Sequence, residues 1–381
     1  MAEAAVSVES QAPASSREEE RISVATQWQL MWWRFRKHKL AMAGGIVIAL
    51  FYAVVILADF LAYSDPSASE AQRGLLPPQG IHLFDNGAFR PHVYALKGRR
   101  DPVTFKRVYA PDPEDKIPIV LFARGFEYKI LGLIPADVHL IGVEEGRKAE
   151  ESIFLLGTDV QGRDVFSRLM FGTQISLTIG LVSVALSLFL GVLLGGISGF
   201  YGGVIDTIIQ RVIEILRSIP TIPLWMGLAA ALPRDWDIIR IYFAITIIIS
   251  LIGWTELARV VRGRFLSLRE EDFVMAAELA GCSRFRIIFR HMVPSFLSHI
   301  IAATTLALPA MVISETSLSF LGLGLRPPAI SWGVLLQQAQ NIQAVAISPW
   351  LLLPAIPVVI AVLAFNFLGD GLRDAADPYG T

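Results

Sequence analysis

The chain has 381 residues, of which 54% are apolar and 18% are charged, and its formal net charge is −1. This balance is too apolar for an ordinary soluble domain and points to a membrane protein. The near-neutral charge, with no basic stripe among aromatic residues, argues against a nucleic-acid partner. The single cysteine, Cys282, excludes an internal disulfide framework and a multi-cysteine zinc site.

The N-terminal part predicts a tail, an interfacial helix and a first span. Residues 1–24 are rich in Ala, Ser and Glu and lack an apolar stretch, which is typical of a disordered cytosolic tail and not of a cleaved signal. Residues 25–61 predict an interfacial helix and the first transmembrane helix. Basic residues crowd its start and keep that end in the cytosol by the positive-inside rule. They are Arg34, Arg36, Lys37 and Lys39.

Six apolar segments are long enough to cross the hydrocarbon core, which takes about 20 residues as a helix. The fold class is therefore an all-α polytopic membrane protein with six transmembrane helices. The segments are 40–61, 175–200, 204–232, 238–261, 300–323 and 351–372. The third is the least regular, because four charges interrupt its first half, and we expect these near water or facing other helices. They are Asp206, Arg211, Glu214 and Arg217.

Residues 62–172 form a large segment between the first two spans, which this topology places outside the cell. Its β-branched and aromatic runs predict a small β-rich insert with short strands. Its histidines show no metal-ligand spacing, so we expect them on the surface. They are His82, His92 and His139. The polar stretch 157–168 fits either an interfacial helix at the outer mouth or a membrane-surface anchor.

Residues 173–372 predict the helical core, in which small residues recur every four positions. Such a face allows close helix packing in lipid and favours an internal helix pair over a seam with a partner subunit. The face consists of Ser183, Ser187, Gly191, Gly195 and Gly199. Glu315 lies inside the fifth span and favours a structural hydrogen bond over substrate contact. Arg211 and Glu214 are three residues apart and are expected to pair.

The cytoplasmic loop 264–298 predicts two short helices joined at a glycine. Asp272 is the expected N-cap of the first helix, Gly281 its left-handed C′ residue, and Ser283 the cap of a second helix that ends before Pro294. The low bulk of Ala276, Ala277 and Ala280 suits docking into a groove on another protein. Four apolar residues are expected to anchor the loop to the bundle, namely Phe285, Ile287, Ile288 and Phe289. The alternative is a solvated amphipathic loop.

The sequence MAAELAG followed by HMVP resembles the EAA loop of ABC importer permeases. The family pattern is Glu-Ala-Ala, three residues, Gly, nine residues, Ile, one residue, Leu-Pro. Ala276, Ala277, Gly281 and Pro294 match it, whereas Met275 stands where the family often has Glu. The stretches LGTDVQGRDVFSRL, ETSLSFLGLGLRPPAISWG and NFLGDGLRDAADP are similar to the dipeptide/oligopeptide/nickel class, and the large insert sets this C-type subunit apart from shorter members.

The resemblance implies a type I importer permease subunit in the bacterial cytoplasmic (inner) membrane, with both termini, including the tail 373–381, in the cytosol. It implies a heterodimer with a second permease, two ATPases docked beneath, and an extracytoplasmic solute-binding protein. ATP and Mg are used by the ATPases, and this chain has no phosphate-binding GxxxxGK[ST] sequence, no cofactor and no catalytic residue of its own. The ATPase-coupling residues are expected to be Asp272, Met275, Ala276, Ala277, Gly281, Ser283, Arg284 and Phe285.

The sequence defines the transported solute less narrowly than it defines the subunits of the transporter. Peptides or peptide-like molecules follow from the resemblance, oligosaccharides or glycosides are an alternative for members with large inserts, and nickel is disfavoured because no exposed His cluster is present. Gly191, Gly195, Arg211, Glu214 and Glu315 are the candidates for helix packing or the pathway. An intramembrane enzyme lacks converging catalytic groups. An ion-driven secondary transporter would show inverted repeats, and none is visible.

Overall fold

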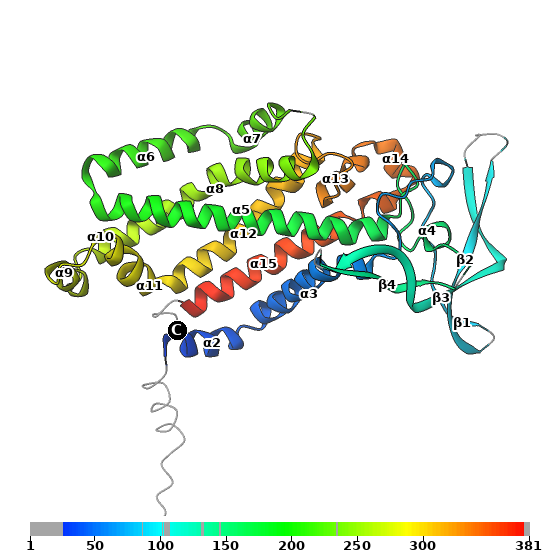
Figure 1. Ribbon diagram of the computed structural model, residues 1–381, viewed down its shortest axis with the longest axis horizontal. Helices are drawn as coiled ribbons and strands as arrows, with labels where there is room; N and C mark the ends of the chain where they lie inside the picture. The colour runs from blue at the N-terminus through cyan, green and yellow to red at the C-terminus, as the bar shows by residue number, and fades with distance from the viewer. Residues whose placement is uncertain are drawn as a thin grey trace, which may run out of the picture.

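Five long helices form the body of the protein. The computed structural model describes residues 26–376 apart from 86, 101, 103–106, 131–132, 145 and 234, so most of the expected tails, 1–24 and 373–381, lie outside it. Within the described residues, these helices are long and apolar enough to cross a membrane. They are α3 (Lys39–Leu61), α5 (Val165–Tyr201), α8 (Ile238–Leu268), α12 (Leu297–Phe320) and α15 (Ala355–Ala376). Figure 1 shows them running together along the long axis.

The expected third span, 204–232, is wrong as a single helix. The chain forms α6 (Gly203–Ser218) and α7 (Thr221–Ala230), which meet at an angle of 86°. The break falls at Ile219 and Pro220, because the residue before a proline is driven out of the helical region and Ile219 is extended. The prediction of six spans holds only if this bent pair makes one crossing.

The helix before the first span is present as predicted. Helix α2 (Gln27–Lys37) begins with a capping box, in which the Thr26 hydroxyl accepts from the Gln29 N–H and the Gln29 side chain accepts from the Thr26 N–H. His38 then breaks the helix, and its ring caps α3 by accepting from the Ala41 N–H. Three tryptophans of α2 point outward, which suits an interfacial position. They are Trp28, Trp32 and Trp33.

The small residues of α5 pack against α8, which confirms the predicted internal helix pair. An ideal Cβ placed on Gly195 would lie 2.5 Å from the Ala258 carbonyl oxygen, and one on Gly199 would lie 2.5 Å from the Phe265 Cβ. Closer to the N-terminus of α5, the Ser250 hydroxyl of α8 donates to the Ser183 carbonyl oxygen of α5 at 3.2 Å. The two backbones can therefore approach closely only because these positions lack bulk.

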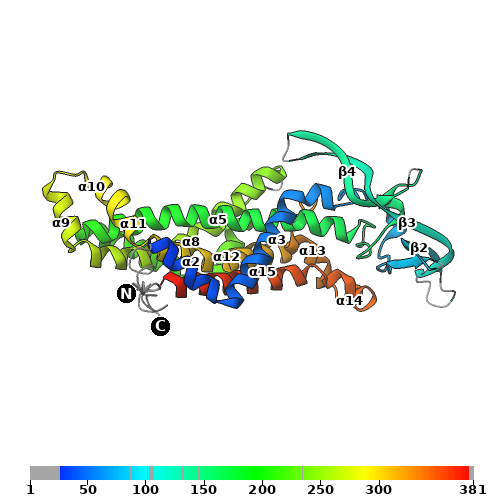
Figure 2. The ribbon, with the colours of Figure 1, turned by 90° about the horizontal axis from the view of Figure 1, so that it is seen from below.

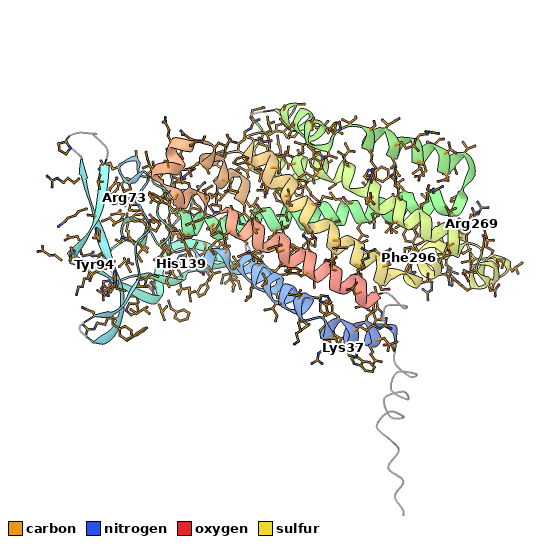
Figure 3. All side chains as sticks on the ribbon, turned by 180° about the vertical axis from the view of Figure 1, so that it is seen from behind. Lys37, Arg73, Tyr94, His139, Arg269 and Phe296 are labelled. Atoms are coloured by element: carbon orange, nitrogen blue, oxygen red, sulfur yellow. The ribbon has the colours of Figure 1, made fainter. Side chains whose placement is uncertain are left out.

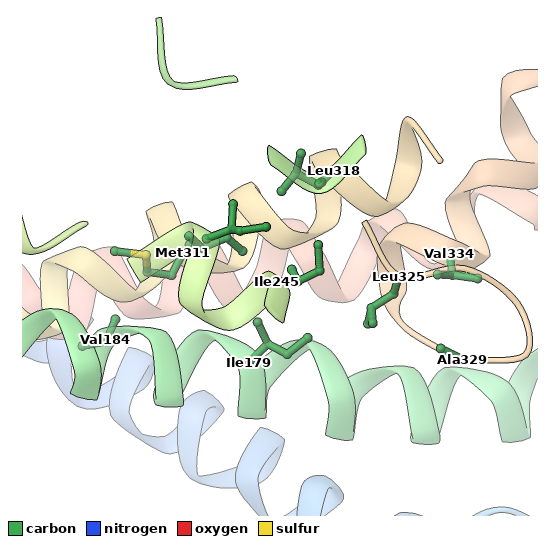
Figure 4. Packing of buried hydrophobic residues seen from close by; sticks show 11 residues of the cluster. Ile179, Val184, Ile245, Met311, Leu318, Leu325, Ala329 and Val334 are labelled. Atoms are coloured by element: carbon green, nitrogen blue, oxygen red, sulfur yellow. The ribbon is translucent and has the colours of Figure 1, made fainter. Parts of the chain in front are cut away.

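The largest apolar core lies where α5, α8 and α12 meet the loop that leads to α13 (Trp332–Gln337). Figure 4 shows Ile179 and Val184 of α5 facing Ile245 of α8 and Met311 of α12. The loop adds Leu325 and Ala329, and α13 adds Val334, so the core joins all these elements. Three short segments link α13 to α15, namely η3 (Gln338–Gln340), α14 (Ile342–Ile347) and η4 (Pro349–Leu352).

The insert is β-rich, as predicted, and forms one antiparallel sheet in the order β1-β2-β3-β4. Its strands are β1 (His82–Asp85), β2 (Ala88–Arg100), β3 (Arg107–Ile130) and β4 (Ile134–Val143). The first half of β3 pairs with β2 and the second half with β4. Short helical turns flank the sheet, namely η1 (Ala71–Arg73) and α4 (Ala149–Ser152).

Two of the three insert histidines are buried, so the expectation of surface histidines is wrong for them. His139 is 1% exposed, and its ring nitrogens lie 3.0 Å from the carbonyl oxygens of Asp59 and Phe126. His92 is buried beneath Tyr94 and His82, and its Nδ1 lies 2.8 Å from the Arg90 carbonyl oxygen. Only His82 stays exposed. Neighbouring rings cover both of them: His82 and Tyr94 contact His92, and Phe126 and Tyr128 contact His139.

The stretch 157–168 forms no separate interfacial helix, so that one of the two alternatives is wrong. Thr158 and Asp164 make a β-bridge, and α5 begins directly afterwards. The Asp164 carboxylate caps α5 by accepting from the Ser167 N–H, and it accepts from the Tyr63 hydroxyl, both at 2.6 Å. Burial raises the pKa of Asp164 to about 6, and these hydrogen bonds oppose that shift. The contacts tie the base of the insert to the first turn of α5.

The α5–α8 contact generates a stability prediction with an internal control. Gly195→Ala should lower the midpoint of thermal unfolding, because its Cβ would overlap the Ala258 carbonyl and overpacking costs about 1 to 3 kcal/mol. Gly263→Ala is the control, because Gly263 lies in helix α8 and no described atom lies within 4 Å of the position that an added Cβ would take. This substitution should be neutral or should stabilise the protein by up to about 1 kcal/mol. Fluorescence-monitored unfolding of the purified protein measures both, and equal midpoints would contradict the close-packing account.

Candidate functional site: the elbow and the membrane cavity

The loop between α8 and α12, here called the elbow (residues 269–296), begins with a short capped helix. Helix α9 (Asp272–Leu279) starts one residue earlier than expected, so Glu271 is the N-cap residue and Asp272 lies in the first turn, where its charge favours the helix dipole. At the other end Gly281 has φ +74°, as predicted. Gly281 and Cys282 donate to the Glu278 and Ala277 carbonyls, which is a Schellman motif.

The second half of the elbow differs from the expected helix. Ser283 caps it as predicted, since its hydroxyl accepts from the Arg286 N–H. The chain then runs through α10 (Arg284–Arg286), the π-helical segment η2 (Ile287–Met292) and α11 (Val293–Ser295). It therefore does not stop before Pro294. The proline is tolerated because it lies in the first turn of α11, where its missing N–H is not required.

One face of the elbow is buried against α8. Val274 and Ala277 of α9, with Ile287 and Ile288 of η2, share an apolar cluster with Phe265. Ala277, an expected ATPase-coupling residue, thus lies in this core and not on the free surface. The expected anchoring role is confirmed for Ile287 and Ile288. The Phe265 and Phe296 rings meet edge to face at 5.8 Å, which joins the end of α8 to the start of α12.

The opposite face of the elbow exposes a group of large apolar side chains, here called the elbow patch. It consists of Phe273, Met275, Leu279, Phe285 and Phe289. Phe285 and Phe289 were expected to anchor the loop, which is wrong, because both are exposed and their tilted rings contact each other, with centroids 4.5 Å apart. The remaining expected coupling residues also lie at the surface, namely Asp272, Ala276, Gly281, Ser283 and Arg284. Arg284 additionally covers the Tyr201 ring of α5.

The elbow and the β-sheet lie at opposite ends of the helical bundle. Figures 1 and 2 show α9 and α10 at one end and β2 at the other. In Figure 3, Arg269 and Phe296 mark the elbow end, and Arg73 and Tyr94 mark the sheet end. Helix α2 and Lys37 also lie toward the elbow end. A signal that enters at the elbow must therefore cross the whole bundle to reach the sheet.

A cavity of about 730 Å³ opens between the bent pair α6–α7, α8 and α12. Its lining mixes apolar side chains with charges of both signs. The main side chains are Arg217, Trp225, Glu256, His299, Met311 and Arg373. Arg217 and Glu256 pair across it. Sequence reasoning missed Glu256, although an acidic residue inside the span 238–261 is itself a signal for a water-filled or polar surface.

The expected pathway candidates do not line this cavity. Arg211 and Glu214 form the predicted pair at 2.5 Å, but on the exposed surface of α6. Glu315 is fully buried and accepts hydrogen bonds from the Ser176 hydroxyl at 2.9 Å and the Ser319 hydroxyl at 2.8 Å. This confirms the favoured structural use of Glu315. Among the described residues, no three His, Cys, Asp or Glu side chains are grouped to hold a metal ion.

A partly buried ion pair fastens α6 to α8, and sequence reasoning missed it. The Asp206 carboxylate accepts from Arg262 Nε at 2.5 Å and Nη2 at 2.6 Å, and also from the Ser198 hydroxyl. The two residues lie 56 positions apart, so local spacing in the sequence does not predict their pairing. The bidentate geometry holds one wall of the cavity next to the elbow end of α8.

The Asp206–Arg262 pair leads to a mutational prediction. Asp206→Ala should destabilise the protein by about 1 to 3 kcal/mol, because it leaves the Arg262 guanidinium partly buried and without its carboxylate. Arg211→Ala, which removes an exposed pair from the same helix, should change stability by less than about 1 kcal/mol. Thermal unfolding of the purified variants gives the comparison. Equal losses would show that Asp206 is no more structural than a surface charge.

Two models of known protein families match parts of the chain. Residues 191–379 match the model described as "Binding-protein-dependent transport system inner membrane component", and residues 26–78 match "N-terminal TM domain of oligopeptide transport permease C". The chain is 42% identical to the oligopeptide transport system permease protein OppC of Escherichia coli K12 over 60% of this chain and 73% of that protein. It is 34% identical to OppC of Bacillus subtilis over 68% and 79%, respectively.

A third relative extends over nearly the whole chain. It is the dipeptide transport system permease protein DppC of Lactococcus lactis, 32% identical over 92% of this chain and 90% of that protein. Among solved structures, the inward-facing MetNI methionine ABC transporter aligns with 55% of this chain at 19% identity and a TM-score of 0.42. The matched models together include α2, α3 and the elbow. The chain therefore belongs to the family of binding-protein-dependent transport system inner membrane components.

Proposed function

We propose that this chain forms half of the translocation pathway of an ATP-driven importer of peptides or peptide-like solutes. Family membership and the names of the relatives, which are oligopeptide and dipeptide permeases, support this proposal. The structural observation that supports this proposal most strongly is the exposed elbow patch, which lies on the short helix α9 and the segment after it at one end of the bundle. The elbow lies within the region matched by the family model.

The elbow is the proposed contact for the ATPase subunits. ATP can shift the permease between arrangements only if the ATPase binds one of them better, which requires a stiff contact. The Schellman turn at Gly281 fixes α9, while the Ile287 and Phe296 contacts carry its movement to α8 and α12. Ala276, Met275 and Phe285 lie on the open side, so we assign them to the contact, and we assign buried Ala277 to packing.

The cavity between α6–α7, α8 and α12 is the proposed segment of pathway. A peptide carries an ammonium and a carboxylate, and the lining carries charges of both signs, namely Arg373 and the paired Glu256 and Arg217, which would exchange each other for the peptide termini. Trp225 adds an apolar surface for side chains. A neutral oligosaccharide, the alternative solute, would use the aromatic ring but not the opposite charges, so the lining favours peptides.

The same proposal assigns the other subunits of the transporter. A second permease subunit completes the pathway as a heterodimer, two ATPases that use ATP and Mg dock at the elbow end, and a solute-binding protein delivers solute at the sheet end. Both termini lie in the cytosol of a bacterium, with the chain in the cytoplasmic membrane. The basic last turn of α2, which includes Arg34, Arg36 and Lys37, supports this orientation.

Two substitutions at Gly281 distinguish the effect of backbone strain on coupling to ATP hydrolysis from the effect of side-chain size. Gly281→Val should reduce uptake of a labelled oligopeptide by about tenfold while ATP hydrolysis persists, because a β-branched residue at φ +74° strains the turn by about 1 to 2 kcal/mol. Gly281→Asn should remain near wild type, since asparagine tolerates this conformation. No described atom lies within 4 Å of the Gly281 Cβ position, so side-chain size alone cannot account for a difference.

The measurement uses the complete transporter in proteoliposomes, with uptake and ATP hydrolysis followed in parallel. Wild-type uptake by the Gly281→Val protein would reject the assigned role of the elbow. Uptake of a labelled oligosaccharide in place of the peptide would retain the coupling mechanism and reject the peptide assignment.

A further inference from the structure

The hairpin formed by the second half of β3 and by β4, residues 119–130 and 133–143, exposes apolar side chains that the transport role does not use. We call these side chains the hairpin patch. It consists of Leu121, Phe122, Ile130, Leu133 and Ile134. Leu133 at the turn is 81% exposed and Phe122 is 64% exposed, values that are unfavourable for large apolar side chains in water. Exposed apolar side chains grouped on one hairpin in this way point to an interaction site.

The hairpin folds back onto the end of α3. The Phe122 and Phe60 rings lie 6.2 Å apart, and the His139 Nδ1 lies 3.0 Å from the Asp59 carbonyl oxygen, which places the hairpin beside the last turn of α3. Figures 1 and 2 both show β4 curving back toward the helices, whereas β2 extends away from them. Figure 3 shows His139 next to the end of the α3 ribbon.

Helix α3 is itself the most open of the five long helices. Only 17% of its most apolar window is buried, and Ile56 and Leu57 near its end face outward. The apolar surface of α3 thus continues through Phe60 and Phe122 onto the hairpin. Since the side chains of a spanning helix that face outward meet lipid, the surface next in line meets the headgroup and upper acyl region.

We propose that the hairpin patch is a membrane-contacting wedge that lies in the interfacial layer of the bilayer beside the end of α3. The β3–β4 ladder pairs Lys129 with Pro135 and Ile130 with Ile134 near the turn, so much of the backbone is hydrogen-bonded before it leaves water. The charges on the hairpin fit the same position. Arg124 lies 3.8 Å from Asp137, and Lys129 has the long stem that lets a charge reach the headgroups.

The backbone at Phe122 supports the wedge independently. Its φ is +56°, a conformation that a bulky residue adopts only at a cost. At this kink two successive apolar residues, Leu121 and Phe122, are both exposed. A strained residue that presents an aromatic ring outward beside a spanning helix is consistent with a lipid contact that compensates the strain.

The test uses lipid-attached quenchers on the complete transporter in phosphatidylcholine nanodiscs. In a Cys282→Ala background, Leu133→Cys is labelled with an environment-sensitive fluorophore. The matched control is Val108→Cys, a 55% exposed apolar position at the far end of β3. Ile134→Cys serves as a second site on the patch. A nitroxide carried on the phosphatidylcholine acyl chain should quench the Leu133 label at least about twofold more than the Val108 label, and aqueous iodide should show the reverse order.

Two results would overturn the wedge. Equal iodide quenching at both positions, with no effect of the nitroxide lipid, would place the hairpin in water. Protection of the Leu133 and Ile134 labels from both quenchers would show that a protein, such as the second permease subunit, covers the patch. Neither result bears on the elbow or on the solute, so the proposed function would stand or fall separately.

Discussion

The close approach of α5 and α8 is the constraint on which the rest of the structure depends. In lipid there is little hydrophobic drive to bring helices together, so packing has to come from backbones that touch. Gly191, Gly195 and Gly199 make that possible along the elbow half of the pair. Nearer the sheet end, Ser183 and Ser250 continue the contact through a hydrogen bond.

The functional elements are attached to one end and the side of α8. The end at Leu268 runs into the elbow, Arg262 pairs with Asp206 of α6, and Glu256 faces the cavity. The elbow packs against the end of α8, which is itself packed closely on α5 and paired through Arg262 with α6. A movement of the elbow would therefore act on α8 first and, through these contacts, on α5 and α6.

The parts of this architecture that follow local rules could be predicted from the sequence. Apolar length located the long helices, and the glycine, serine and helix-forming residues of the elbow predicted the turn at Gly281 and the cap at Ser283. The failures involve long-range or competing terms. The Asp206–Arg262 pair joins residues 56 positions apart, and the facing of Ala277 and Phe285 depends on how α9 docks. The length of the segment 204–232 favoured one span over a break at Ile219 and Pro220, and the burial of His139 depends on contacts such as that with Asp59, 80 positions away.

The most direct measurement of the central claim is photo-crosslinking from the elbow patch. Leu279 is 90% exposed and packs against no described core, so replacing it with a benzoylphenylalanine leaves the fold intact. In membranes that contain the complete transporter, irradiation should join this position to an ATPase subunit, with a yield that changes when ATP is added. A protein that copurifies with its ATPase but gives no ATPase product from Leu279, with or without ATP, would contradict the account of the elbow as the coupling site.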